Sequence, residues 1–262
     1  MKIKRLRRVR GLKFGTIFAL AMALVSCGLS EAETTKNAPV MVPENGAEPS
    51  PEVPAAQVEL LGPENSESDS PIASYNFKDH TYPLPRGWQE AEGDLVLEKG
   101  FRRTTEERIG MEYLTTKFFD ATGDGQDEAV VILKIGTGGS ALPHLVYVFE
   151  WKEDRPELVW YFRTGDRADG GLKKINPEEG AVVVELFGQD RYIFGEMETL
   201  KITGDEVQLC CPTHYTKTKY RFTNGSFRMD GDRLTYSIVD PGAEPVPNLG
   251  ELKAKEAGEP RK

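Results

Sequence analysis

The middle of the chain alternates between short apolar runs and turn sequences. Nearly continuous apolar runs occupy residues 129–135, 144–151, 158–162 and 181–187. Runs of this length, rich in β-branched and aromatic residues, are typical of strands that are covered on both faces. The turn sequence Asp154-Arg155-Pro156 separates the second run from the third. We therefore expect those two strands to pair as a hairpin near the centre of a sheet.

Turn signals also divide the C-terminal half. Residues 200–203 and 206–211 flank Gly204-Asp205, while Asn224-Gly225 and Asp230-Gly231 divide residues 216–238 into three expected strands. Asn-Gly and Asp-Gly favour type I′ turns, which need positive φ at both central positions. Basic and apolar residues alternate over 216–222. That strand should therefore have one face in water.

The pattern predicts very little helix. Only residues 104–111 have helical character, with Thr104 or Thr105 as the N-cap. Apolar strands that helices cannot cover must pack against another sheet or close into a barrel. We therefore predict a mainly β protein, with a single antiparallel, meander-rich, sandwich or barrel-like domain over residues 74–240 and at most one or two short helices.

Both flanks of this domain have a different composition. Residues 27–73 contain seven prolines among Glu, Ala, Ser and Asn, and residues 241–262 combine proline with Lys and Glu. Segments of this kind bury too little apolar surface to offset the entropy of ordering them. They are expected to be a disordered linker and a disordered tail.

The N-terminus looks like a signal sequence. Seven Lys and Arg residues precede an apolar run over 14–25, which is too short for a permanent membrane span. The run ends in Leu24-Val25-Ser26-Cys27, which resembles the lipobox of bacterial lipoproteins. The resemblance implies that residues 1–26 are removed, that Cys27 carries lipid, including palmitate, and that the protein is anchored in the cell envelope. By the same resemblance, glycine at position 28 implies the outer membrane, facing the periplasm. The alternative is an ordinary secretory signal with Cys27 left as a thiol.

The net charge limits the classes of partner that the protein can bind. Seven of the 33 Lys and Arg residues and none of the 42 acids precede Cys27, so loss of the leader changes the net charge from -9 to -16. A strongly acidic surface repels nucleic acid. It is compatible with cations and with basic protein partners.

One acidic loop is a candidate calcium site. Oxygen side chains follow at alternate positions after residue 119, with glycine where the chain turns, as a hard cation requires. The candidate ligands are Asp120, Thr122, Asp124, Gln126 and Glu128. Val131 stands where an EF-hand needs glutamate, and the spacing instead resembles the short loops of FG-GAP repeats. The alternative is a hairpin turn in which Asp120 caps backbone amides and Gly125 has positive φ.

Two adjacent thiols are the second candidate. Cys210 and Cys211 precede Pro212, and His214 follows. A disulfide between neighbours is strained, because consecutive Cα atoms lie closer than in ordinary disulfides. The pair has four alternative fates: a structural vicinal disulfide, inert thiols, an intermolecular disulfide, or metal or redox chemistry together with His214.

Two glycine-rich loops are the third candidate. Residues 136–143 and 164–171 follow strands expected to be central, and glycine lets a backbone approach a ligand closely. The polar residues in and beside these loops are Ser140, His144, Asp166, Arg167 and Asp169. The alternative is a pair of wide turns with an internal Asp-Arg pair. Residues 136–138 are not a dinucleotide fingerprint, since a strand follows instead of a helix.

The motifs together resemble a loose family of bacterial envelope proteins. The sequences DxTGDGxxEA, TGDRADGG and CCPT over residues 113–222 resemble the LppP/LprE type of lipoproteins. The resemblance implies an envelope lipoprotein and carries no catalytic residue. We therefore expect a non-enzymatic β domain that binds a protein or a cell-wall component. The alternative is an envelope enzyme that uses the thiol pair, calcium or the glycine-rich loops.

Overall fold

The structure is a computed structural model that describes residues 59–85, 94–105, 109–136, 143–198 and 211–247. All of them belong to one compact unit, Ser50–Lys262. The expected leader, the lipidated Cys27 and the first part of the linker lie outside the described residues. Within the described part, no helix is long and apolar enough to cross a membrane.

Strands dominate the described residues, as predicted from the sequence. Two 3-10 helices, η1 (Pro71–Ser74) and η2 (Phe77–Asp79), are the only helical elements there. The strands are β1 (Thr81–Pro83), β2 (Asp94–Val96), β3 (Phe101–Arg102), β4 (Gly110–Phe119), β5 (Glu128–Gly136), β6 (His144–Lys152), β7 (Arg155–Arg163), β8 (Leu172–Glu178), β9 (Ala181–Phe187), β10 (Ile193–Phe194), β11 (Met197–Glu198), β12 (His214–Thr223), β13 (Ser226–Met229), β14 (Leu234–Ser237) and β15 (Val246–Pro247).

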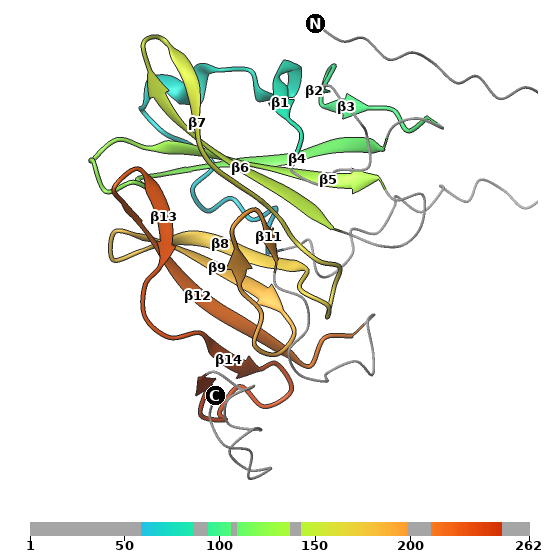
Figure 1. The fold of residues 1–262 in the computed structure, drawn as a ribbon, viewed down its shortest axis with the longest axis vertical. Helices are drawn as coiled ribbons and strands as arrows, with labels where there is room; N and C mark the ends of the chain where they lie inside the picture. The colour runs from blue at the N-terminus through green and yellow to red at the C-terminus, as the bar shows by residue number, and fades with distance from the viewer. Residues whose placement is uncertain (1–58, 86–93, 106–108, 137–142, 199–210, 248–262) are drawn as a thin grey trace, which may run out of the picture. The chain divides into compact units, whose positions relative to one another are not determined.

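The strands form two large sheets and one small one. The first large sheet has the order β10-β11-β7-β6-β5-β4-β3, and the second has the order β15-β14-β12-β9-β8, with β13 beside β12. Neighbouring strands are antiparallel except for β11 and β7. Strands β1 and β2 pair only with each other. The predicted sandwich architecture is confirmed, with consecutive strands β3 to β7 forming a meander (Figure 1).

The first sheet is covered on both faces, which explains its continuous apolar runs. On its inner face, side chains from β5 and β6 such as Val130, Ile132 and Val148 share a core with Val184 of the second sheet. On its outer face, neighbours in the same strands share a second core with η1, η2, β1 and β2. The members of that core from these elements are Val131, Leu133, Leu145, Tyr147, Ile72, Phe77, Tyr82 and Leu95. The expectation that these strands are covered on both faces is confirmed.

Part of the expected linker belongs to the folded domain. Leu60 and Ile72 are fully buried, one in each core. The side chain of Lys117 on β4 donates to the backbone oxygens of Gly62 and Glu64. The boundary expected at residue 74 is therefore corrected, because a few well-placed apolar side chains hold residues 59–73 on the sheet despite their polar composition. The expected tail is corrected likewise over 241–247, where β15 pairs with β14.

The helix expected over residues 104–111 is wrong at its C-terminal end. Gly110 and Met111 begin β4, while residues 106–108 lie outside the described part of the chain. The hydroxyl of Thr104 accepts a hydrogen bond from the Gly110 backbone N–H at 3.1 Å. Thr104 therefore closes a loop between two strands, as its capping chemistry allows in a turn as well as in a helix. The strand expected at 200–203 and nearly all of that at 206–211 also lie outside the described residues.

The turns follow the sequence signals with two differences. Asn224 and Gly225 both have positive φ and join β12 to β13 as predicted. At residues 230–231 only Gly231 has positive φ, and β13 and β14 pair with different parts of β12 instead of with each other. In the β6–β7 hairpin the positive φ angles fall at Glu153 and Asp154. The turn is thus one residue earlier than expected, and Arg155 and Pro156 belong to β7.

Candidate functional site

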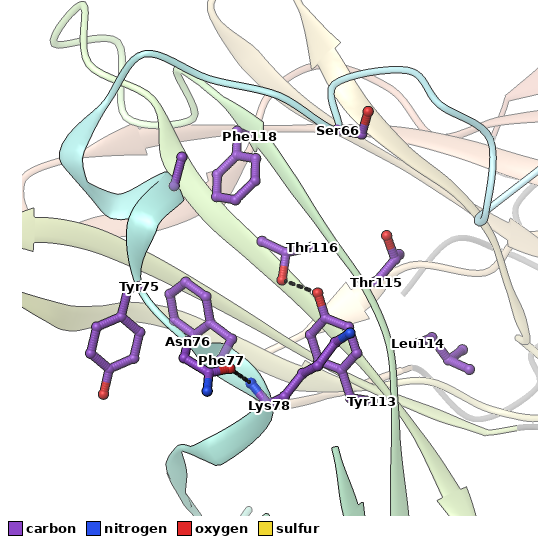
Figure 2. Close-up of a pocket in the computed structure, with 11 residues that line it drawn as sticks. Ser66, Tyr75, Asn76, Phe77, Lys78, Tyr113, Leu114, Thr115, Thr116 and Phe118 are labelled. Carbon is purple, nitrogen blue, oxygen red and sulfur yellow. Dashed lines mark hydrogen bonds between the residues drawn. The ribbon is translucent and has the colours of Figure 1, made fainter. Parts of the chain in front are cut away.

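A groove opens along one side of β4. It encloses about 450 Å³ between β4 and the segment that carries η1 and η2. Figure 2 shows its lining, in which four aromatic rings stand among hydroxyl and amide groups. The residues that line it are Ser66, Ala73, Tyr75, Asn76, Phe77, Lys78, Tyr113, Leu114, Thr115, Thr116 and Phe118.

The groove runs along the edge of β4 and does not lie on one face of the sheet. Tyr113 and Phe118 pack against the outer core, whereas Leu114 packs against the inner core. All three side chains line the groove. A cavity in contact with side chains from both faces of a strand lies at the strand's edge, since successive side chains point to opposite faces.

A β-bulge shapes this edge. The pairing of β4 with β5 shifts register between Tyr113 and Thr115, so Leu114 is the extra residue on β4. Bulges bend a strand and are frequent at sheet edges and beside functional sites. The hydroxyl of Tyr113 lies 2.9 Å from the hydroxyl of Thr116, and this hydrogen bond fixes both side chains in the wall of the groove (Figure 2).

Among the described residues, two other segments form backbone hydrogen bonds with this edge of β4, one on each side of Thr116. The Tyr113 N–H donates to the Gly100 oxygen at 2.8 Å, and the Phe118 N–H donates to the Asn65 oxygen at 2.7 Å. Asn65 has a φ of 57° and lies in a turn. The stretch of β4 between these contacts is where the groove opens.

Two lysine side chains lie near the groove, on opposite faces of β4. The exposed ammonium of Lys78 lies 5.3 Å from the centre of the Tyr113 ring, within the range of cation–π attraction. The Lys117 side chain points to the other face of β4, where it binds the oxygens of Gly62 and Glu64. Burial lowers the pKa of Lys117. Lys117 therefore holds the wall in place, and Lys78 is the cation available to a ligand.

The acidic loop after β4 has its carboxylates turned onto the backbone. Asp120 accepts hydrogen bonds from the amides of Gly123, Asp124 and Gly125, at 2.6, 3.2 and 3.0 Å. Asp124 accepts from the amide of Gln126. Gly125 has a φ of 87°. This is the capped turn that the sequence left open as the alternative to calcium, and a cation would have to displace these amides. Calcium binding here stays a prediction.

Glu128 closes the same loop from inside the protein. It is 1% exposed, and its carboxylate accepts from the backbone amides of Ala121 and Thr122 at 2.7 and 2.9 Å, with the Thr122 hydroxyl at 3.4 Å. Burial raises its pKa to about 7, although the two amides oppose the shift. Glu128 is therefore a loop-fixing carboxyl that titrates near neutral pH. No group of His, Cys, Asp and Glu suited to hold a metal ion occurs among the described residues.

The structure brings several of the predicted loop residues to one end of the sandwich. His144 begins β6 and exchanges hydrogen bonds with Thr164, where the second glycine-rich loop starts. In that loop Asp169 binds the guanidinium of Arg191 at 2.9 Å. Asp166 and Asp169 bridge each other through the backbone, and Arg167 has a φ of 44°. Ser140 lies outside the described residues.

Close packing gives the glycines of this loop a structural role. A Cβ atom on Gly170 would lie 2.2 Å from the Glu198 carboxyl group, and one on Gly165 would lie 1.8 Å from the Asp169 oxygen. Arg191 is 1% exposed between Asp169 and Glu198. The loop thus wraps an internal charge cluster, and its glycines allow this close packing. Asp169 of this loop pairs with Arg191, which lies outside the loop, and an Asp-Arg pair within the loop stays a prediction.

The two predicted histidines differ in environment. His144 is 2% exposed, and neither ring nitrogen has a hydrogen-bond partner. Burial, together with Lys134, lowers its pKa to about 4, so the ring is a neutral core residue at pH 7. The Nδ1 atom of His214 lies 3.1 Å from the Gln189 amide nitrogen and 2.9 Å from the Thr213 hydroxyl.

Only one of the two predicted thiols lies among the described residues. Cys211 is exposed just before β12, and Cys210 lies outside the described residues. The redox state of the pair stays a prediction.

No sequence pattern singles out the groove residues. Tyr75, Phe77 and Lys78 lie just after the expected domain boundary, in a segment with too little periodicity to suggest a site. Their only signal is the cluster of aromatic residues that begins at the boundary. Arg191 and Glu198 were missed as well, because each is an ordinary charged residue in a short segment.

Comparison with known proteins adds no relative, since no family model, curated protein or solved structure matches the chain. The resemblance to LppP/LprE-type lipoproteins stays a prediction.

Proposed function

We propose that this chain is a lipid-anchored protein of the bacterial cell envelope, whose β domain binds a protein or cell-wall partner without catalysing a reaction. The anchor is Cys27, supported by the order of basic head, apolar run and Leu24-Val25-Ser26-Cys27. An outer-membrane position facing the periplasm follows from Gly28. Two or three acyl chains hold a protein on a membrane far more firmly than one does.

The observation that carries the binding role is the groove beside β4. It combines aromatic rings that supply contact area with hydroxyl, amide and ammonium groups that orient a ligand. The polar residues predicted from the sequence have structural partners instead. Asp120 and Glu128 bind amides, and Asp169 binds Arg191. The groove is therefore a described surface suited to a partner.

Site-specific photo-cross-linking tests this proposal in the native cells. A photoreactive residue replaces Lys78, which lines the groove, and a matched control carries it at Lys152, which is exposed at the far end of β6. We expect one discrete adduct from position 78 and none from position 152. Equal labelling at both positions, or none at position 78, would contradict a binding role for the groove.

The anchor is tested in the same cells. Cys27→Ser should move the protein from the membrane fraction to the soluble fraction, and mass spectrometry of the native protein should find acyl chains on Cys27. An unmodified, full-length leader in a soluble cytosolic pool would contradict the envelope assignment.

A further inference from the structure

We propose that the groove binds its partner by strand addition: an extended peptide segment of another protein pairs with the open edge of β4 at Thr116. This inference rests on the proposed binding function and specifies the chemistry of the partner. It depends on the direction of backbone groups along β4, which the pairing geometry fixes.

The direction of the Thr116 backbone follows from its neighbours. In an antiparallel strand the N–H and C=O groups of successive residues point to opposite sides, so those of residues two apart point to the same side. Lys117 and Phe118 pair with Val130 and Ala129 of β5, and the Phe118 N–H points away from β5, toward Asn65. Thr116 is two residues earlier, beyond Lys117, so its N–H and C=O point away from β5 as well.

The outward groups of Thr116 face the groove. The loop hydrogen bonds among the described residues include one to Tyr113 and one to Phe118 but none to the Thr116 backbone. Thr116 is 7% exposed and lines the groove. Unpaired donors and acceptors at a strand edge are a template for another strand. Peptide recognition by strand addition uses such edges, with main-chain hydrogen bonds for affinity and pockets for alternate side chains.

The side chains favour a segment that is apolar on one face. A strand added at Thr116 would place alternate side chains toward the outer face, beside Tyr113 and Phe118. The Thr116 hydroxyl already bonds to Tyr113, so the backbone and not this side chain offers the free polar groups. The Gly100 and Asn65 contacts limit the paired stretch to a few residues. The occupant we infer is therefore a short extended segment with an apolar residue at its centre.

The experiment uses the full-length protein in detergent micelles and a displayed library of random ten-residue peptides. A peptide selected by the wild-type protein is synthesised with a single N-methyl group at each position in turn. Each N-methyl group removes one backbone donor and leaves the side chain in place. We expect binding to weaken about tenfold or more at alternate positions within the few residues that pair with β4, and little at the other positions, because the lost hydrogen bond is compounded by the clash of the methyl group with β4.

Two variants at one position supply the matched control. Thr116→Pro removes the outward N–H, which edge strands tolerate, and should weaken peptide binding about tenfold or more. Thr116→Val keeps the N–H, removes only the hydroxyl and should bind within about threefold of wild type. The melting temperature of each variant reports folding. If Thr116→Pro does not fold, the N-methyl series on the wild-type protein still decides the matter.

The outcomes separate this inference from the proposed function. Loss of binding without a two-residue period, or equal binding by Thr116→Pro, overturns strand addition. Selection of no peptide, while position 78 still forms an adduct in cells, also overturns it and leaves the binding role standing. Binding of soluble peptidoglycan fragments that Thr116→Pro does not change would identify a glycan as the occupant instead. A wild-type dimer that Thr116→Pro dissociates would identify a second copy of this chain.

Discussion

The two faces of the first sheet are covered by different kinds of structure. The inner face packs against a complete second sheet, through a core made mainly of Val, Leu and Ile. The outer face is covered by two 3-10 helices and by β1 and β2, each three residues long, through a core rich in aromatic rings. A sheet satisfies its own backbone over its whole length, whereas short irregular segments leave openings at their ends.

The difference between the covers of the two faces determines where the groove lies. His80 illustrates how the outer cover is held, since its ring lies within 6 Å of four aromatic rings: Tyr82, Phe149, Tyr75 and Phe77. Large rings fill the volume between this cover and the sheet, so the backbones of the two layers make few contacts with each other. On the inner face, residues such as Lys117 pin the flanking segment to β4. The groove thus opens where the aromatic cover ends and the edge of β4 begins, and the sandwich holds a site that short irregular segments complete.

The largest effect is expected on the inner face. Phe162 on β7 is fully buried in the core between the sheets. Phe162→Ala should lower the free energy of unfolding by about 3–5 kcal/mol, because it removes transfer free energy and leaves a cavity between two sheets that cannot collapse onto it. Urea unfolding followed by tryptophan fluorescence measures this. Phe162→Leu, which keeps most of the volume, should lose roughly 1 kcal/mol. Equal losses in both variants would mean that the inner core is loosely packed.

A smaller and more local effect is expected on the outer face. Phe77 is 3% exposed and contacts the rings of Tyr75 and Phe149. Phe77→Ala should cost less than about 3 kcal/mol in global unfolding, since the cover can open while the sandwich stays folded. Hydrogen exchange measures the difference. The Leu97 amide, which donates to His80, should exchange much faster in the variant, while the Val131 amide on β5 should change little. Equal acceleration at both amides would show that the two layers unfold together.

The same contrast explains how much of the fold the sequence predicted. Strands β5, β6 and β9 are long apolar runs with two buried faces, so their pattern is strong, and alternation in β12 correctly placed Lys217 and Lys219 on a partly exposed face. The outer cover has no comparable period. Leu60 and Ile72 are isolated apolar residues in a polar, proline-rich stretch, and their burial depends on tertiary contacts that composition cannot show.

The candidate site was harder to predict than the fold. The sequence offered Asp120 and Glu128 as metal ligands, and their carboxylates bind backbone amides of their own loop. Motifs record which groups are close along the chain. The groove instead depends on a bulge at Leu114 and on an edge left open between Asn65 and Gly100, which arise only when distant segments meet.

The smallest effect concerns the end of the inner face, where Glu128 makes stability depend on pH. Its ordinary pKa is 4.5, and burial raises it to about 7 in the folded protein. Its contribution to stability is therefore complete below pH 4.5 and is lost as the pH rises through 7. Glu128→Gln has no such proton, so its free energy of unfolding relative to wild type should rise by on the order of 2 kcal/mol from pH 5 to pH 8.

The variant must be compared with wild type at each pH, because His144 on the same face opposes Glu128. Burial lowers the pKa of His144 from 6.5 to about 4, so its contribution is complete above pH 6.5 and is lost as the pH falls through 4. The two opposing pH dependences partly cancel in the free energy of unfolding of wild type. They separate only in the difference between Glu128→Gln and wild type. Gln126→Ala, at an exposed position of the same loop, removes no titrating group; it is the matched control, and its free energy of unfolding relative to wild type should not change with pH. Parallel curves for Glu128→Gln and wild type would show that the Glu128 carboxyl group is hydrated in the folded protein, and that the inner face is less tightly closed at this end than the core between the sheets.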